Sequence, residues 1–566
     1  MALADYVVTD ELTVLLGLIA ASVFLLRNLY KPQSLVHPIL LGRQSDVSRV
    51  RNPGESAVYR NYGTGMLGRL PHRPANNVQL ITDLVKTDFD SPRTLWSTKV
   101  TNAQLKARVA ALGTGLIRLA NLVPGESNVL LLLNDSLEFI LADLALASHA
   151  IPSFTLSSLA LLSPVLDLHS PSAIITHAAF LPQLLELLCD ARAQGEAHTV
   201  IALGTLPATL DLQRAPNVTV LSWSDVESAG VKASDKVAPS TVGPEDVFTV
   251  SFYSTPSGAV RSAHFTHQNI TAGVAATRAL LPPNALLSAL DTVLSAHALS
   301  SGIGRALAYT AIYEGTSFAT LASTALISPS STKLDVADLL SATSLPLPSP
   351  TVLFVTPAHA RALSTAILSA AAASSPLAAP LATRHKLAAL AEGFVTRDSL
   401  WDRLVFDGAR VGVMGAGAGT VRAVIALNRG LAATDLTPAR LALSVPFVHA
   451  HAHPLVAAPV FASHALDLQA FDEPSSGGSG SAHVGPPSAN VEAKLVRVDE
   501  AELASGADPV GDVLVRGPAV GRGVGVGEEG EVAGAVGTET GGEEGWVETG
   551  ERGRVLTNGT FKVWTA

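Results

Sequence analysis

The sequence is poor in charged residues, aromatic residues and cysteine. Only 15% of its 566 residues are Asp, Glu, Lys or Arg, only 5% are Phe, Trp or Tyr, and Cys189 is the single cysteine. One cysteine cannot form an intramolecular disulfide, which excludes a disulfide-stapled extracellular scaffold and favours a reducing compartment. The net charge of −10 and the absence of a basic stripe exclude a typical nucleic-acid-binding protein, which needs concentrated Lys and Arg to contact phosphates.

What the sequence does contain is length and many hydrophobic residues, which make up 48% of the chain. A single hydrophobic core stops growing at roughly 250–300 residues, so a chain of 566 residues indicates two or three subdomains. After residue 95, short apolar runs such as 128–133 alternate with helical patterns such as 102–120. That alternation predicts layers of helices around a largely parallel sheet. Two segments rich in Gly, Ser and Glu, 473–481 and 521–545, are predicted to be loops.

The N-terminus carries an uninterrupted run of apolar and small residues, 12–26. Acidic Asp10 and Glu11 precede this run, and basic Arg27 follows it. By the positive-inside rule this pattern predicts one membrane-spanning helix over residues 12–30, with the rest of the chain in the cytosol. Two alternatives remain, a cleaved signal peptide and a helix that lies in the membrane interface, and the acidic residues argue against the signal peptide.

The segment SFYSTPSGAVRSAHFTHQNI (251–270) has the order expected of a phosphate-binding loop. An apolar strand pattern leads into a turn of Ser, Thr and Gly, followed by Arg261 and then by the start of a helix. Backbone N–H groups, hydroxyls and one cation can converge on phosphate oxygens in such a layout. The alternative is an ordinary serine-rich turn.

With Thr266 and His267 as the anchor, this segment resembles the phosphate loop TSGTTGxPKGVxxTH of the AMP-forming acyl-CoA synthetase superfamily. The positions that match, or that keep a hydroxyl or a positive charge, are Ser254, Ser257, Gly258, Arg261, Thr266 and His267. The positions that depart from the pattern are Tyr253, Thr255, Pro256 and Ser262. Because glycines let the backbone approach phosphate closely and proline has no N–H, these departures are expected to weaken phosphate binding.

Further stretches resemble the long-chain fatty acyl-CoA synthetase branch of that superfamily, in the family's order along the chain. They are residues 124–153, 291–305, 349–363, 401–419 and three stretches between 483 and 563. The resemblance implies an α/β fold of layered subdomains with a small distorted β-barrel, as in the large N-terminal domain of adenylate-forming enzymes.

The expected organisation follows from the resemblance and from the N-terminal pattern. Residues 1–11 form a short non-cytosolic N-terminus, 12–30 a membrane anchor helix, 31–94 a connector, and 95–566 the AMP-binding large domain. In the family a hinge and a small lysine-bearing C-terminal domain follow the large domain. Since the sequence stops at Ala566, the small domain is expected to be absent.

Members of the family convert a fatty acid and ATP to an acyl-AMP, from which CoA displaces AMP. The resemblance therefore implies ATP, Mg²⁺ and CoA as cofactors, and a fatty acid or acyl-adenylate-like ligand. His451 falls at the aromatic residue of the family's YGxTE motif, and Leu455 at its glutamate, which helps to hold magnesium. Leucine offers no oxygen ligand, so no metal site is predicted. Glu551 retains the carboxylate of the TGD motif that holds the ribose, and Gly415 and Gly417 lie in a turn near the adenine pocket.

These substitutions, with the absence of the lysine-bearing domain, predict impaired catalysis. The predicted function is a membrane-anchored, AMP-binding protein like a long-chain fatty acid–CoA ligase, with the endoplasmic reticulum as the expected membrane. The alternative is a catalytically inactive synthetase-like protein that acts as a binding or scaffold protein at a membrane.

Two remoter interpretations arise from single motifs. Residues 411–427 fit a strand, a Gly-rich turn and a helix, with Asp435 about twenty residues after the first glycine, as in dinucleotide-binding folds. No second βαβ half follows, which argues against that function. His449, His451 and His453 alternate and would share one face of a strand, where they could bind zinc. Neighbouring carboxylate and thiolate ligands are absent from this stretch of sequence.

Overall fold

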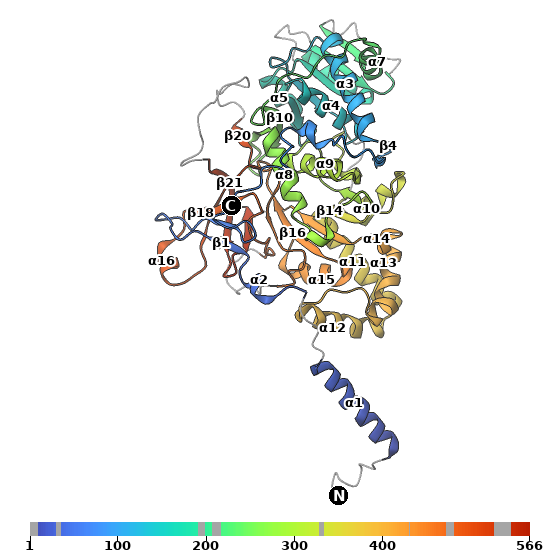
Figure 1. The fold of residues 1–566 in the computed structure, drawn as a ribbon, viewed down its shortest axis with the longest axis vertical. Helices are drawn as coiled ribbons and strands as arrows, with labels where there is room; N and C mark the ends of the chain where they lie inside the picture. The colour runs from blue at the N-terminus through green and yellow to red at the C-terminus, as the bar shows by residue number, and fades with distance from the viewer. Residues whose placement is uncertain are drawn as a thin grey trace.

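The structure, a computed structural model, describes residues 10–29, 35–190, 198–206, 217–327, 333–428, 431–470, 480–525 and 545–565. Three β-sheets organise the molecule (Figure 1). We call them the N-terminal, central and C-terminal sheets. The N-terminal sheet lies at the top of Figure 1, the central sheet lies below it, and the C-terminal sheet lies to the left of the central sheet. This arrangement confirms the predicted α/β class.

The N-terminal sheet has eight strands, of which β10, β11 and β20 pair antiparallel and the others pair parallel. All four residues of β5 are buried, as expected of a parallel strand covered on both faces. The strands in spatial order are β20 (Arg522–Gly525), β11 (Val260–Thr266), β10 (Val247–Ser254), β6 (Ser153–Leu156), β5 (Val129–Leu132), β7 (Ala173–His177), β8 (His198–Leu203) and β9 (Val218–Ser222). Its helices are α3 (Asn102–Leu119), α4 (Leu137–Ser148), α5 (Leu162–Leu168), α6 (Leu181–Asp190) and α7 (Trp223–Lys232).

The central sheet also has eight strands, and all pairs except β3–β4 and β16–β17 are parallel. The strands in spatial order are β17 (Pro459–Ala462), β16 (Phe447–Ala452), β15 (Ala423–Leu427), β14 (Val352–Val355), β12 (Thr292–Ser295), β13 (Ser317–Thr320), β3 (Arg93–Leu95) and β4 (Thr98–Val100). The helices along this part of the chain are α8 (His267–Arg278), α9 (Gly302–Glu314), α10 (Val336–Ser341), α11 (Pro357–Ser374), α12 (Ala378–Ala391), the π-helical turn η10 (Asp402–Phe406), α13 (Asp407–Met414), α14 (Gly417–Thr420) and α15 (Ala433–Leu443).

The C-terminal sheet has six antiparallel strands and combines both ends of the chain. The strands in spatial order are β1 (Ser45–Val47), β2 (Tyr59–Asn61), β18 (Glu492–Val496), β19 (Val510–Arg516), β21 (Val547–Val555) and β22 (Phe561–Thr565). Two short helices, α2 (Pro38–Gly42) and α16 (Glu500–Ala504), accompany it. The N–H of Gln44 donates to the carbonyl of Asn558 at 2.8 Å, and the hydroxyl of Ser45 donates to the carbonyl of Gly559. These bonds bring the β1 edge onto the β21–β22 turn, as in the distorted barrel that the resemblance implies.

Two sequence predictions need correction. Residues 411–427 do not run from strand to helix: the helices α13 and α14 come first, and strand β15 follows. The segment 521–545 is not only a loop, because Arg522–Gly525 forms β20 at the edge of the N-terminal sheet. Within the connector 31–94, the chain forms β1 and β2 of the C-terminal sheet. Most of the predicted loop 473–481 lies outside the described residues.

The N-terminal helix α1 (Glu11–Leu29) matches the predicted 12–30 closely in extent and leaves the body at the bottom of Figure 1. Among the residues that the structure describes, however, no helix is long and apolar enough to cross a membrane. The apolar run 12–26 spans about 22 Å as a helix, against about 30 Å for a hydrocarbon core. The prediction of a membrane-spanning anchor is therefore not supported.

Candidate functional site

The predicted phosphate loop is the tight turn between β10 and β11. The N–H of Thr255 donates to the carbonyl of Ala259, and the N–H of Gly258 donates to the carbonyl of Thr255, both at 2.9 Å. The N–H of Ala259 donates to the hydroxyl of Thr255 at 3.1 Å. A phosphate-binding loop instead directs its N–H groups towards the ligand. Three candidate donors of this turn are therefore satisfied inside the turn itself.

The predicted residues of this segment have two different placements. Ser254, Ser257, Gly258 and Arg261 are exposed on or beside the turn. Thr266 instead begins α8: its hydroxyl accepts the N–H of Asn269 at 3.2 Å, and its own N–H donates to the Asn269 side chain at 2.8 Å. This capping box stabilises the start of the helix, so the structure gives Thr266 a structural role.

His451 and Glu551, which were assigned from two separate motifs, contact each other directly. The Nε2 atom of His451 lies 2.7 Å from Oε2 of Glu551, and the side chains are only 1% and 3% exposed. His451 belongs to β16 of the central sheet, and Glu551 to β21 of the C-terminal sheet. Two residues later, Nε2 of His453 lies 3.0 Å from the carbonyl oxygen of Thr549. These contacts fasten the end of β16 to β21.

Leu455 lies next to this pair in an apolar setting. Its side chain is buried and faces β20, because a Cβ atom placed on Gly523 would lie 3.0 Å from its Cδ2 atom. Its carbonyl accepts the N–H of Gly521 at 2.8 Å. Magnesium requires oxygen ligands, and the side chain at this position has none. The residues present therefore do not fit a magnesium ion held at the family's glutamate position.

The alternating histidines do not converge on a common point. Nδ1 of His449 lies 2.7 Å from the carbonyl oxygen of His483, whereas His451 and His453 bind different residues of β21. Burial lowers the pKa of His449 to about 3. Within the described ranges, no group of three His, Cys, Asp or Glu residues is placed to hold a metal ion.

Gly415 lies in the turn between α13 and α14, and Gly417 is the first residue of α14. Gly415 is exposed and has a φ of 58°, and Gly417 is buried beside Pro350. A dinucleotide loop needs a strand before the turn and a helix after it. In the structure, helix α13 precedes the turn, and the four residues of α14 and then strand β15 follow it. The segment therefore lacks the element order of a dinucleotide-binding loop.

Sequence reasoning missed a fully buried polar cluster between α4 and α9. Nε of Arg305 lies 3.2 Å from Oδ2 of Asp143, and the Tyr309 hydroxyl donates to the same oxygen at 2.7 Å. The Ser153 hydroxyl donates to Oδ1 of Asp143 at 3.1 Å. One signal was available in the sequence, an aspartate inside the apolar helix LEFILADLALAS. A buried carboxylate needs partners, so Asp143 could have been flagged.

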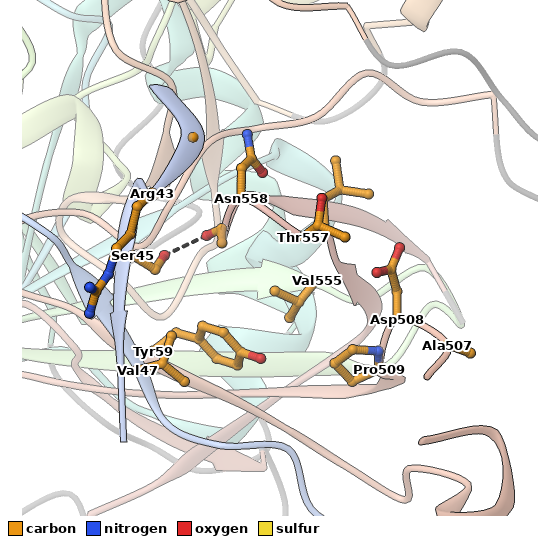
Figure 2. A pocket seen from close by; sticks show the side chains of 13 residues that line it. Arg43, Ser45, Val47, Tyr59, Ala507, Asp508, Pro509, Val555, Thr557 and Asn558 are labelled. Atoms are coloured by element: carbon orange, nitrogen blue, oxygen red, sulfur yellow. Dashed lines mark hydrogen bonds between the residues drawn. The ribbon is translucent and has the colours of Figure 1, made fainter. Parts of the chain in front are cut away.

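A cavity of about 420 Å³ lies at the C-terminal sheet, away from the predicted site residues (Figure 2). The Tyr59 ring extends across it with its hydroxyl towards Pro509, and Asp508 and Asn558 lie along its wall. Burial, with a smaller effect of Asp508, raises the pKa of Tyr59. None of the residues with a predicted nucleotide role lines this cavity.

Comparison with known sequences gives the family. The sequence model described as "AMP-binding enzyme" matches residues 86–524. The human protein Long-chain-fatty-acid–CoA ligase 1 is 30% identical over 182 residues, which cover 32% of this chain and 23% of the human one. The peroxisomal Long chain acyl-CoA synthetase 7 of Arabidopsis thaliana is 25% identical over 436 residues, covering 73% of this chain and 55% of the relative. The chain thus matches about a quarter and about half of these two relatives.

Solved structures share the fold at low sequence identity. The anthranilate CoA ligase AuaEII, solved with anthranoyl-AMP, superposes with a TM-score of 0.59 and 16% identity, covering 86% of this chain and 78% of that one. The N-terminal domain of FACL13 from Mycobacterium tuberculosis gives a TM-score of 0.56 at 14% identity, covering 86% of this chain and 100% of that domain. The family model, the long-chain acyl-CoA synthetase relatives and this shared fold agree, and the chain belongs to the AMP-binding enzyme family.

Proposed function

We propose that this chain is an acyl-CoA synthetase-like protein that binds ATP or an acyl-adenylate-like ligand but forms acyl-adenylate slowly or not at all. The observation that carries the proposal is the buried contact between His451 and Glu551. In the resemblance these two positions face the nucleotide. Here the His451 and Glu551 side chains are hydrogen-bonded to each other at 2.7 Å, so a bound ribose has to compete with this buried bond.

Two further observations support impaired adenylation. The Leu455 side chain supplies no charge or oxygen atom at the position where the family holds magnesium. The N–H groups of the Thr255–Ala259 turn donate hydrogen bonds within the turn rather than to a phosphate. Loss of a single electrostatic contact to the transition state commonly costs about 3–4 kcal/mol, which corresponds to a factor of roughly 10²–10³ in rate. Several such losses together reduce turnover to background.

The substrate class in this proposal is a long-chain fatty acid, by likeness to the named human and Arabidopsis relatives. ATP is the proposed nucleotide and CoA the proposed acyl acceptor. No reaction step is assigned to magnesium, because Leu455 does not fit it. In this proposal, His451 and Glu551 hold the central and C-terminal sheets together at the nucleotide site.

Fatty-acid-dependent exchange of pyrophosphate into ATP tests the proposal, together with calorimetric binding of ATP and of a non-hydrolysable acyl-adenylate analogue. The expected result is exchange at background and measurable binding of at least one of the two ligands. Robust exchange would overturn the impaired-catalysis part. Absence of exchange and of binding would overturn the nucleotide-binding part and favour a scaffold.

We also propose that α1 holds the protein at a lipid surface, with the cytosolic face of the endoplasmic reticulum as the membrane to test first. The support is the exposure of its apolar side chains, such as Leu12 at 64% and Phe24 at 67%. Such a helix is stabilised by burial in the interface of a bilayer. Flotation of the full chain with phosphatidylcholine vesicles tests this, and recovery of all the protein in the unbound fraction would overturn it.

A further inference from the structure

The helices α12, η10 and α13 form a layer with apolar side chains on its outside. Six large apolar residues on these helices or beside them are exposed, and we call this set the leucine platform. Its members are Leu377 at 90%, Leu381 at 58%, Leu387 at 41%, Leu400 at 67%, Leu404 at 63% and Val411 at 59% exposed. Single exposed leucines are ordinary, but a group on adjoining helices marks an interaction surface.

Three charged side chains of the same layer are buried and contact one another. Nζ of Lys386 in α12 lies 2.6 Å from both carboxylate oxygens of Asp402 in η10. Nη1 of Arg410 in α13 contacts the same carboxylate at 2.9 Å. The three side chains are 7%, 0% and 0% exposed. Three charged groups of this layer are thus buried, whereas Arg384 and Arg403 are exposed beside the platform.

The buried charges also make the platform rigid. The Asp402 carboxylate joins three helices, and Nε of Arg410 donates to the carbonyl of Ala442 at 2.8 Å. The Phe406 ring lies beneath, with the Lys386 and Arg410 cationic groups each 5.6 Å from its centroid. The exposed leucines are thus held on fixed elements, and the surface is present before any partner binds.

The position of the platform indicates a lipid surface as the partner. The N–H of Leu35, just after the helix α1 and its short link, donates to the carbonyl of Gly393, two residues after the end of α12, at 3.4 Å. Figure 1 shows α1 leaving the body at the end where α12 lies. In α2, which begins three residues after Leu35, Ile39 and Leu40 are 72% and 53% exposed. Three apolar segments therefore lie at one end of the molecule.

We propose that the leucine platform rests on a lipid bilayer beside α1. This inference rests on the lipid association proposed for α1, and it adds which face of the body meets the membrane. A lipid surface can cover α1, α2 and the platform together, whereas a second copy of the chain docked on α12 and α13 covers only the platform. Burial of the apolar side chains in the acyl boundary supplies the driving force.

The test is an environment-sensitive fluorophore on the platform of the full chain. Cys189 is first replaced by serine, and the dye NBD is attached to a new cysteine in the variant Leu404→Cys. The matched control is Leu168→Cys, because Leu168 is 52% exposed at the end of α5, which lies at the top of Figure 1, away from α1 and α12. With phosphatidylcholine vesicles, the dye at position 404 should shift to the blue and brighten several-fold, and the dye at position 168 should not change.

Other outcomes overturn the proposal in distinguishable ways. No flotation with vesicles would overturn the lipid association of α1 and this inference with it. Flotation with an unchanged dye at position 404 would overturn the inference alone. A blue shift at 404 without vesicles that grows with protein concentration would assign the platform to a second copy.

A second test measures the vesicle binding of two variants that carry no dye. Leu381→Glu combined with Leu404→Glu should weaken vesicle binding several-fold relative to Leu168→Glu. Because all three leucines are exposed, the thermal midpoints should remain close to that of the unmodified chain. Equal vesicle binding by the platform variant and the control would contradict the proposal.

Discussion

Glu551 has almost no access to water, and its Oε2 lies 2.7 Å from Nε2 of His451. Removing one partner of a buried hydrogen bond costs about 1–3 kcal/mol. We therefore expect His451→Ala to lower the free energy of unfolding by that amount, measured by urea denaturation. The matched control is Glu548→Ala on the same strand, because Glu548 is 51% exposed and its bond to Arg497 is worth at most about 1 kcal/mol. Equal losses in the two variants would contradict a special role for the buried pair.

His449 makes stability depend on pH in a defined direction. Burial lowers its pKa to about 3 in the folded protein, against about 6.5 in an unfolded chain. Between these values the unfolded state binds the extra proton, so stability is lost as the pH falls below 6.5, by up to about 1.4 kcal/mol per pH unit. Asp135, whose pKa burial raises to about 6, acts in the opposite direction.

The variant His449→Asn isolates this contribution. Asparagine can still donate to the carbonyl of His483, but it cannot titrate. We expect its loss of unfolding free energy between pH 7 and pH 5 to be smaller by about 1–2 kcal/mol than that of the unmodified chain. The control is His385→Asn, which makes the same exchange at an exposed position.

At single residues, the sequence could predict that His451 and Glu551 lie together, but not the buried polar cluster. Motif order placed His451 and Glu551 in one site, and the structure joins them although 100 residues separate them. Asp143 and Arg305 are 162 residues apart and lie in two different stretches that resemble the family, 124–153 and 291–305. Local spacing cannot predict their contact, because it is made only in the tertiary fold.

The turn of the β10–β11 hairpin holds Gly258 in a left-handed backbone conformation. Gly258 has a φ of 85°, and no atom lies within 4 Å of the place where a Cβ would be. Gly258→Ala should therefore cost about 1–2 kcal/mol of unfolding free energy through backbone strain alone. Ser257→Ala, one residue earlier at an exposed position, should cost less than about 0.5 kcal/mol. Urea denaturation of both variants checks this, and equal costs would contradict the strained turn.

The sequence predicted helix and strand positions wrongly where the composition fitted both kinds of element. Residues 411–427 are rich in Ala, Val and Gly, so a short apolar run fits a strand or a buried helix equally well. Arg410 lies within α13 and is buried among the charges of α12 and η10. This burial fixes residues 407–414 as a helix. The strand β20 arises in a Gly-rich segment because β11 offers an edge to pair with, from Arg261 to His264. Neither the burial of Arg410 nor the pairing with β11 can be predicted from the local sequence, because both are tertiary contacts.

At the scale of the whole molecule, the N-terminal and central sheets share one hydrophobic core. The helix α4 belongs to the first sheet and α9 to the second, and the Asp143–Arg305 pair crosses between them without any exposure. Because this pair has its partners in both layers, the two sheets are expected to unfold together rather than one after the other.

Arg305→Met tests that coupling. It leaves the Asp143 carboxylate buried with only hydroxyl partners, so we expect a loss of about 3–5 kcal/mol in unfolding free energy. The double variant Asp143→Leu with Arg305→Met removes both charges, and since an apolar pair of similar volume is often neutral, it should recover much of that loss. Calorimetry should show one transition for the unmodified chain and the double variant. Additive losses in the two single variants, or two separated transitions in the unmodified chain, would show that the sheets are stabilised independently and that this ion pair does not join them.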